Sequence, residues 1–406
     1  MSRVRRTSAV ADVFVPFLRL GLTSFGGPVA HIAYFRTAFV ERLAWLDDGE
    51  FARLVAICQA MPGPASSQLG MAIGMLRGGM PGLFAAWLGF TLPSAVLMVA
   101  LAVGVTRFGE VIDPGLLIGL KIAATAVVAH ALIGMSRALC PDRPRQSLAL
   151  AAGALVLLVP GVIGQVAVIV AAGLAGRLLA LGGEQPRAHA ARMPVSARTA
   201  ALALAAALGL LVALPMIAAL TQWTWVALTE GFYRAGALVF GGGHVLLPLL
   251  QPVVLEPGWV SSELFLAGYG AAQAMPGPLF TFAGYLGAVY GATVGEGALL
   301  TAVGFGFLAL GAIFLPSMLL VVGVIPLAER LLDRRGLRGA LVGINAGVVG
   351  LLVGAFYDPV WVSSILGPAH LALALVAFAL LAVWRWPPWL VVVLSGGAAM
   401  ALPVFA

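Results

Sequence analysis

The residues best suited to chemistry in this chain are Gly- and Pro-rich motifs that occur twice within apolar stretches. The hexapeptide Gln-Ala-Met-Pro-Gly-Pro occupies residues 59–64 and again residues 273–278. Each copy follows a Phe-Gly-Gly sequence, at 25–27 and at 240–242. Glycine lets the backbone turn and approach a ligand closely, and proline ends one helix and starts another. A helix that starts inside a protein presents free N–H groups and a positive dipole end, which bind oxyanions.

The residues around these breaks form a candidate binding site for an anion. Serine and threonine hydroxyls, histidine rings and glutamine amides all donate hydrogen bonds to oxygen. The expected substrate-binding residues are Gly26, Gly27, His31, Gln59, Gly63, Ser66, Ser67, Gly241, Gly242, His244, Gln273, Gly277 and Thr281. The alternative is that the motifs are only kinks and packing surfaces, with the histidines and glutamines as structural donors. Their symmetric occurrence favours a site between two halves.

Two arginines lie at matching points of the two halves. Arg19 and Arg234 each precede the Phe of a Phe-Gly-Gly sequence by six residues. A charge inside a spanning helix is costly unless it is paired or hydrated. The planar guanidinium fork suits a tetrahedral oxyanion better than the point charge of a lysine does. We therefore predict that both arginines bind substrate; the alternative is that each snorkels to the membrane interface.

Another set of ionisable residues is suited to coupling or gating. Lys121 lies inside the apolar stretch 115–136, where a charge needs a function or a partner. Acidic residues interleave with arginines in the segment 36–53, which is typical of an amphipathic helix or a surface gate held by ion pairs. The candidates for coupling or gating are Lys121, Glu41, Asp47 and Asp48.

Composition places the chain among membrane proteins. Of its 406 residues, 61% are hydrophobic and only 10% are charged, so no segment can form a separate soluble domain. The net charge of +7 is scattered over short loops, which argues against a nucleic-acid partner and for a lipid bilayer. Cys58 and Cys140 form no metal or redox motif. We expect no cofactor and no enzymatic activity.

Thirteen apolar segments are expected to enter or cross the membrane. They are 10–34, 51–76, 81–104, 115–136, 147–160, 163–180, 199–221, 231–250, 263–289, 298–324, 339–356, 368–383 and 388–405. The predicted organisation is an N-terminal repeat at 1–184, a basic connector with a central helix at 185–224, and a C-terminal repeat at 225–406. Whether the Pro-Gly-Pro segments are kinked spans or re-entrant hairpins stays open, because both satisfy the freed backbone groups.

A single helix between two copies with an even number of helices inverts the membrane orientation of the second copy. The charges of the loops support this inversion. Equivalent loops of inverted copies should carry opposite bias of Lys and Arg. The loop with Arg137, Arg143 and Arg145 corresponds to 357–367, which has no Lys or Arg. We therefore predict an all-α polytopic membrane protein of two inverted-topology repeats, about six helices each, joined by a central helix. The amino terminus is expected on the cytoplasmic side.

The paired motifs resemble those of the two-domain chromate ion transporters. The matching elements are the two Phe-Gly-Gly sequences, with Ala30-His31 and His244, the two Gln-Ala-Met-Pro-Gly-Pro copies, and Leu-Pro-Ser at 92–94 and 315–317. This resemblance implies a multi-pass protein of the bacterial inner membrane that exports chromate, driven by the proton motive force with protons as the coupling ion. Sulfate is the natural competitor, because the two dianions share charge and shape.

Alternatives to chromate export stay open at this point. An anion channel would share the anion-attracting breaks but would pass its ion only down the gradient. A transporter of sulfate, phosphate or an organic acid would share the scaffold, since a fold constrains the ligand only loosely. The oligomeric state is equally open, with a homodimer among the alternatives. The mechanism that we expect is alternating access, with one site between two inverted halves.

Overall fold

The computed structural model describes residues 10–25, 27–108, 113–181, 194–240, 243–295, 298–327 and 335–401. These residues contain helices and no β-strand. Six of the described helices are long and apolar enough to cross a membrane: Ala65–Phe108, Pro114–Leu139, Gly161–Leu178, Ala197–Thr221, Leu299–Leu327 and Gly336–Ser364. The prediction of an all-α polytopic membrane protein is therefore confirmed.

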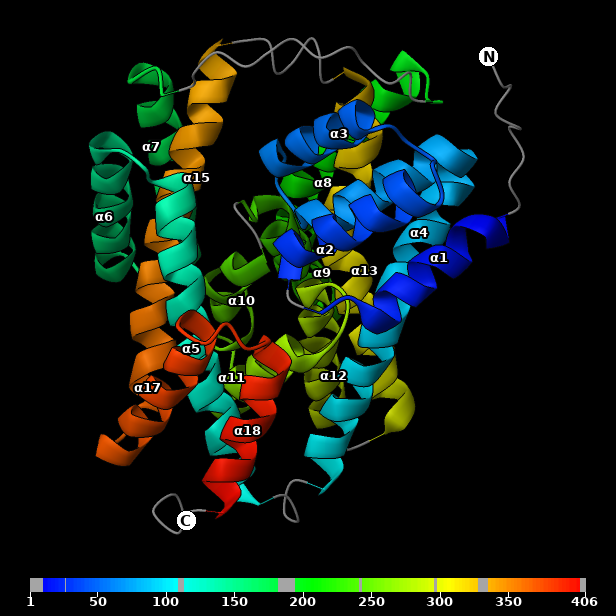
Figure 1. The fold of residues 1–406 in the computed structure, drawn as a ribbon. Helices are drawn as coiled ribbons and strands as arrows, with labels where there is room; N and C mark the ends of the chain where they lie inside the picture. Colours follow the sequence, from blue (N-terminus) through cyan, green and yellow to red (C-terminus); the bar gives the residue numbers. More distant parts are fainter. Residues whose placement is uncertain are drawn as a thin grey trace.

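The first half runs from α1 to α7 and the second from α9 to α18 (Figure 1). The first contains α1 (Val10–Thr23), α2 (Gly27–Arg36), the π-helix η1 (Thr37–Arg42), α3 (Asp48–Ala60), α4 (Ala65–Phe108), α5 (Pro114–Leu139), α6 (Arg143–Leu158) and α7 (Gly161–Leu178). Helix α8 (Ala197–Thr221) connects the halves. The second contains α9 (Thr224–Leu238), η2 (Gly243–Val245), α10 (Leu246–Val254), α11 (Ser262–Ala274), η3 (Leu279–Thr281), α12 (Phe282–Val294), α13 (Leu299–Val324), η4 (Ile325–Leu327), α15 (Arg335–Ala355), η5 (Phe356–Trp361), α16 (Val362–Ser364), α17 (Pro368–Ala382) and α18 (Pro388–Ala401).

The chain reverses direction at its first Phe-Gly-Gly break. The rings of Phe17 in α1 and Phe35 in α2 have centroids 5.6 Å apart, although 18 residues of straight helix would rise about 27 Å. Helices α1 and α2 are thus the two arms of a hairpin. The single helix predicted over 10–34 is wrong, because the glycines do not merely kink the helix but let the chain fold back.

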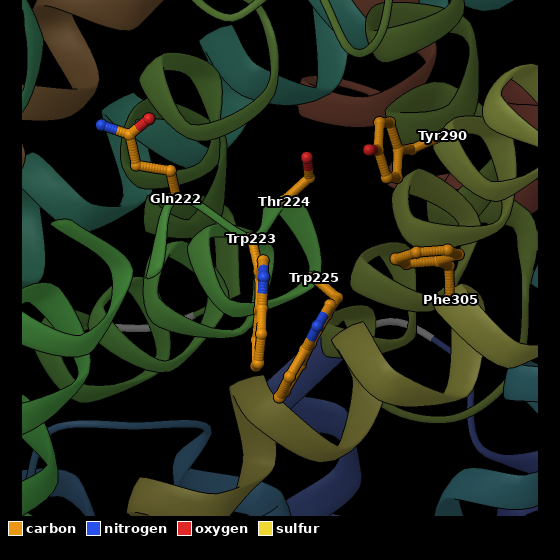
Figure 2. Close-up of a pocket in the computed structure, with 6 residues that line it drawn as sticks. All are labelled: Gln222, Trp223, Thr224, Trp225, Tyr290 and Phe305. Atoms are coloured by element: carbon orange, nitrogen blue, oxygen red, sulfur yellow. The ribbon is translucent and has the colours of Figure 1, made fainter. Parts of the chain in front are cut away.

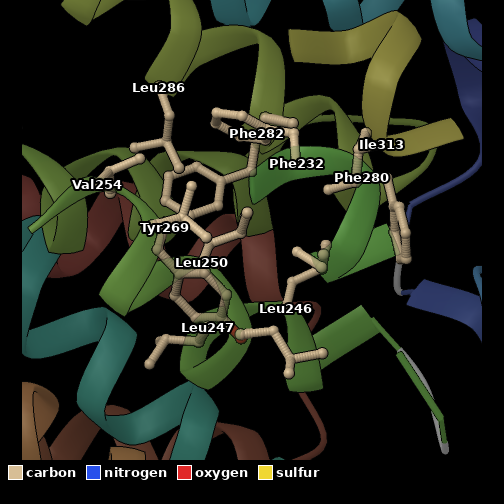
Figure 3. Close-up of a cluster of buried hydrophobic side chains, with 14 of the residues drawn as sticks. Phe232, Leu246, Leu247, Leu250, Val254, Tyr269, Phe280, Phe282, Leu286 and Ile313 are labelled. Atoms are coloured by element: carbon tan, nitrogen blue, oxygen red, sulfur yellow. The ribbon is translucent and has the colours of Figure 1, made fainter. Parts of the chain in front are cut away.

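The corresponding segments of the second half also fold back at their motifs. A Cβ added to Gly231 in α9 would meet Val253 in α10. The Tyr285 hydroxyl of α12 donates to the Leu264 carbonyl of α11 at 3.0 Å. Figure 3 shows side chains from α9 to α13 meeting in one apolar cluster between these arms. The segments predicted at 231–250 and 263–289 are therefore hairpins too.

A second type of glycine break divides α4 into two arms. Gly78 and Gly79 have non-helical backbone angles, and Gly79 has φ +63°, which a side chain would strain. The arm 65–77 follows the Pro-Gly-Pro break, and the arm 80–108 is long enough to span the membrane. This division agrees with the predicted boundary between the segments 51–76 and 81–104.

The two halves exchange their helices at the periphery. Helix α5 of the first half packs on α17 and α18, and α15 of the second half packs on α6 and α7. Small residues make the close contact in both places: an added Cβ would meet the backbone of Ser395 at Gly119, and that of Ala172 at Gly343. Close backbone approach through small residues is the usual basis of helix association in membranes.

One glycine contact allows a test of this packing. A Cβ at Gly236 in α9 would meet the carbonyl oxygen of Ile313 in α13, whereas one at Gly311 on the exposed face of α13 would meet no atom within 4 Å. We expect Gly236→Ala to destabilise the folded protein by about 1 to 3 kcal/mol through overpacking. Gly311→Ala is the matched control and should leave the melting temperature of the purified protein unchanged. Equal melting temperatures for the two variants would contradict the contact.

Candidate functional site

The breaks of the two halves bond to each other at the centre of the molecule. The Gly63 N–H of the first Pro-Gly-Pro donates to the Val239 carbonyl at 2.6 Å, and the Gly277 N–H of the second donates to the Ser24 carbonyl at 2.8 Å. Gly63 and Gly277 are equivalent in the two hexapeptides, and Ser24 and Val239 each immediately precede a Phe-Gly-Gly. We call these four residues the crossing. Each half thus satisfies a backbone group that the other half's break leaves free.

Only glycine fits at the two donor positions of the crossing. Gly63 has φ +120° and Gly277 has φ +93°, conformations that side chains rarely adopt. An added Cβ at Gly63 would collide with the Ser317 hydroxyl, and one at Gly277 would lie 2.8 Å from the Ser94 hydroxyl. Ser94 and Ser317 belong to the two Leu-Pro-Ser sequences, so a third repeated motif takes part in the crossing.

His31 locks the first break to the start of α4. Its Nε2 lies 3.2 Å from the Ser24 carbonyl oxygen and its Nδ1 lies 3.2 Å from the Ser66 hydroxyl. A carbonyl can only accept, so in the neutral ring Nε2 carries the proton and Nδ1 accepts from Ser66. The ring is 1% exposed. Both nitrogens of His31 and the Ser66 hydroxyl therefore have partners within the protein.

Several buried polar groups near the crossing have no hydrogen-bond partner among the described residues. They are the hydroxyls of Ser24, Ser67, Thr91 and Ser317 and the amide oxygen of Gln68. The Gln68 amide nitrogen, by contrast, donates to the Pro62 carbonyl at 2.5 Å. Leaving a buried polar group unpaired costs about 1 to 3 kcal/mol, so such groups are concentrated where a ligand or water completes them. Four hydroxyl donors are the hydrogen-bonding groups that an oxyanion requires.

The two predicted arginines differ in their surroundings. Arg19 lies on the exposed face of α1. Arg234 is largely buried in α9, and its Nε donates to Glu230 Oε1 at 2.6 Å while Nη2 donates to Oε2 at 3.3 Å. The structure does not bring the two guanidinium groups to equivalent places, and the Arg234 charge is neutralised by Glu230 one helical turn earlier.

The other predicted binding residues have differing surroundings. The Thr281 hydroxyl donates to the Pro278 carbonyl at 2.9 Å, which closes the turn after the second break. Gln59 is exposed at the end of α3, whereas the equivalent Gln273 is half-buried beside the Tyr269 hydroxyl. Gly27 has φ +78° and starts α2. Gly26, Gly241, Gly242 and the side chain of His244 lie outside the described residues.

The predicted coupling or gating carboxylates all have structural partners. Arg36 binds Glu41 through Nη1 at 2.5 Å and Asp48 through Nη2 at 2.7 Å. The Asp48 carboxylate raises the pKa of the Arg36 guanidinium. Asp47 caps α3 by accepting from the Glu50 N–H at 2.8 Å, and the Glu50 side chain completes the capping box. These exposed contacts fix the turn between η1 and α3.

Lys121 lies apart from those carboxylates, in the second turn of α5. Its Nζ donates to the Ser363 carbonyl at 3.3 Å, across to the second half of the chain. The residue is 8% exposed. Within its own helix, the Lys121 carbonyl accepts a hydrogen bond from the Thr125 hydroxyl at 3.1 Å.

Sequence reasoning did not select Ser24, Ser317 or Glu230 as functional residues. Ser317 had a signal, because Leu-Pro-Ser occurs once in each half at matching positions. Ser24 immediately precedes a recognised motif, but nothing in its type shows that its carbonyl accepts a bond from the other half. The Glu230–Arg234 spacing of four residues is the ordinary spacing of a helical ion pair.

An aromatic cleft lies at a different place, where α9 starts and α12 ends. Figure 2 shows its lining residues, Gln222, Trp223, Thr224, Trp225, Tyr290 and Phe305, around a volume of about 450 Å³. The rings of Trp223 and Trp225 are stacked with centroids 5.8 Å apart. Amphipathic aromatic rings gather at the membrane–water interface, and exposed stacked tryptophans are typical of such an anchor. We therefore place the candidate site at the crossing rather than in this cleft.

The described part of the chain contains no cluster of three or more His, Cys, Asp or Glu side chains that could hold a metal ion.

Long apolar helices around a centre of broken helices and buried hydroxyls define a multi-pass membrane protein of the transporter class. The chain belongs to the chromate transporter family, whose model matches residues 11–177 and again residues 226–401. Two matches to one family model are what a duplicated chain gives.

Similar proteins span almost the whole chain. A chromate transport protein of Pseudomonas aeruginosa is 27% identical over 395 residues, covering 96% of this chain and 91% of its own. A chromate transport protein of Cupriavidus metallidurans is 27% identical, covering 86% and 82%. A probable chromate transport protein of Synechococcus elongatus is 26% identical, covering 84% and 81%. No solved structure matches the chain significantly.

The glycine requirement at the crossing can be tested by a single methyl group. Gly277→Ala adds a Cβ beside the Ser94 hydroxyl at a φ of +93°. We expect a loss of at least about 1 to 2 kcal/mol from the backbone conformation alone, and loss of transport in the protein that still folds. Gly104→Ala in α4, where an added Cβ meets no atom within 4 Å, is the control. Normal stability and transport in Gly277→Ala would show that the crossing tolerates a side chain.

A double-mutant cycle separates the two roles open to Arg234. Glu230→Gln or Arg234→Gln alone leaves a largely buried charge unpaired and should cost about 3 kcal/mol, read from the thermal melting of purified protein. The double variant removes both charges and should recover most of this stability. If Arg234 binds substrate, the double variant will fold but will not transport. Recovery of both folding and transport would assign Arg234 to structure alone.

Proposed function

We propose that this protein carries chromate out of the bacterial cytoplasm across the inner membrane, and that the dianion binds at the crossing. The unpartnered hydroxyls near the crossing are the observation that carries the proposal, since they are buried donors without an acceptor among the described residues. Membership of the chromate transporter family and the names of the similar proteins support chromate as the substrate.

The crossing offers a dianion a substitute for its hydration shell. Ser67 lies in the first turn of α4, where the helix dipole is positive and main-chain N–H groups are free. Ser317 of α13 lies beside the first break, since its hydroxyl is one of the two atoms that a Cβ on Gly63 would meet first. Hydroxyls and helix-start N–H groups bind a tetrahedral oxyanion without a formal counter-charge.

Alternating access follows from the reciprocal bonds of the crossing. We propose that the two repeats are related by an inverted pseudo-symmetry, which the exchanged Gly63–Val239 and Gly277–Ser24 bonds support. Breaking one bond while keeping the other would open the site toward one side only. The buried crossing of this structure would then be an occluded state between the two open ones.

The Glu230–Arg234 pair provides a route for proton coupling. A proton on Glu230 removes the charge that holds Arg234, which frees the guanidinium for an anion. Arg234 lies five residues before Val239, on the helix that ends at the crossing. Proton and chromate would in this way be linked through one arginine. The coupling or gating role of Glu41, Asp47 and Asp48 stays a separate prediction, and their partners hold an exposed turn.

Transport in inside-out membrane vesicles tests the proposal. We expect labelled chromate to accumulate in vesicles containing the protein when the membrane is energised, and excess sulfate to compete. Chromate uptake that does not depend on the proton gradient and proceeds only down the chromate gradient would indicate a channel. Sulfate accumulation without chromate accumulation would keep the scaffold and change the substrate.

A pair of hydroxyl deletions tests the place of binding. Ser317→Ala removes an unpartnered donor at the crossing, and we expect chromate affinity to fall about tenfold with unchanged folding. Thr106→Val is the control, because the Thr106 hydroxyl donates only to the Ala102 and Val103 carbonyls of its own helix. The measurement is the chromate concentration at half-maximal uptake. Equal values for Ser317→Ala and wild type would remove Ser317 from the site.

A further inference from the structure

Lys121 is a buried cation for which the described residues supply no carboxylate. Its side chain is 8% exposed, and its one hydrogen bond goes to a neutral acceptor, the Ser363 carbonyl at 3.3 Å. Ion pairs in the described part of the chain include those of Arg36, Arg145 and Arg234 with their acids, and Lys121 is not among them. An ammonium group has three N–H donors, so the Ser363 carbonyl leaves donors unused. A buried charge normally has a partner, because burial without one is costly.

The residue that accepts from Lys121 leads to hydroxyl donors of the second half. The Ser363 hydroxyl lies 3.1 Å from the Ser262 hydroxyl in the first turn of α11. The Ser364 hydroxyl, next in the chain, is 2% exposed and has no partner among the described residues. Helix α11 has 13 residues and a positive end at Ser262. Ammonium, hydroxyls and a helix start are three kinds of group that bind an oxyanion.

We propose that Lys121 and the Ser262 and Ser363 hydroxyls form a second binding site for the transported oxyanion, a tetrahedral dianion such as chromate or sulfate. The proposal rests on the proposed function and adds a place that the crossing does not include. Lys121 changes its assignment from coupling or gating to anion binding.

Helix α11 runs from the proposed Lys121 site to the crossing. It begins at Ser262, whose hydroxyl contacts that of Ser363, and ends at Ala274, two residues before the second Pro-Gly-Pro. Its 13 residues place the two ends about 20 Å apart. Figure 1 shows α11 beside α5 along this path. An anion released from the crossing would therefore meet Lys121 before it leaves the protein.

The second site belongs to one end of the molecule only. The two Leu-Pro-Ser sequences are 223 residues apart, and this offset makes Ile344 the equivalent of Lys121. The two hexapeptides are 214 residues apart, and this offset makes Asp48 the equivalent of Ser262. An aliphatic group and a carboxylate do not bind an anion. The two halves thus differ at these positions, and the Lys121 ammonium has no cationic equivalent at Ile344.

Equilibrium binding to full-length protein in lipid nanodiscs tests this site. Labelled chromate, sulfate and phosphate are titrated separately, and the number of saturable sites and their affinities are measured. We expect wild type to bind two chromate ions. Lys121→Met should lose one of them or weaken it by about tenfold to a hundredfold, because a charge-assisted contact is removed. Lys121→Arg should retain both, and Ile344→Met is the matched control at the equivalent position.

The outcomes distinguish the two proposals. Loss of one site in Lys121→Met with the Ser317-dependent site intact supports the inference. A second variant, Ser262→Ala with Ser363→Ala, keeps the cation and should weaken the same site, so the test does not depend on the folding of Lys121→Met. Unchanged binding in both variants would overturn the second site and leave the crossing in place. Wild-type protein that binds none of the three oxyanions would overturn both proposals.

Discussion

A backbone N–H or carbonyl group freed by a helix break inside an apolar interior must find a partner, and this requirement organises the whole molecule. Gly63 and Ser24 are freed in one half, and Gly277 and Val239 in the other. The Gly63 and Gly277 N–H groups each find their acceptor in the opposite half. The two breaks therefore satisfy each other, which fixes the two halves against each other at the crossing.

The same constraint explains why polar chemistry gathers where it does. Glycine is needed for the left-handed backbone at Gly63 and Gly277, and the missing side chains leave room for the Ser317 and Ser94 hydroxyls. His31 Nε2 donates the second hydrogen bond that the Ser24 carbonyl oxygen accepts, in addition to that of the Gly277 N–H. The unpartnered hydroxyls near the crossing carry no formal charge. The Arg234 guanidinium is paired with Glu230, and the Lys121 ammonium donates to the neutral Ser363 carbonyl.

Most of what could be predicted followed from the repeated motifs and the apolar runs. The class of protein, the long helices such as 115–136 and 298–324, and the positions of the breaks followed from apolar runs and repeated motifs. The direction of the chain after each break did not follow. A helix from 10 to 34 and a hairpin with its turn at the glycines have the same composition, and only the contact of Phe17 with Phe35 distinguishes them.

The sequence by itself determined that the chain lies in a membrane, that it is built from two copies of one family domain, and that each copy breaks its helices at fixed places. Hydrophobicity and backbone freedom are properties of single residues, so a linear chain displays them. Tertiary structure decided which groups meet: Gly63 with Val239, Arg234 with Glu230, and Lys121 with Ser363. Partners of this kind depend on long-range packing, and Arg19 and Arg234, which share the same local motif, have different surroundings for that reason.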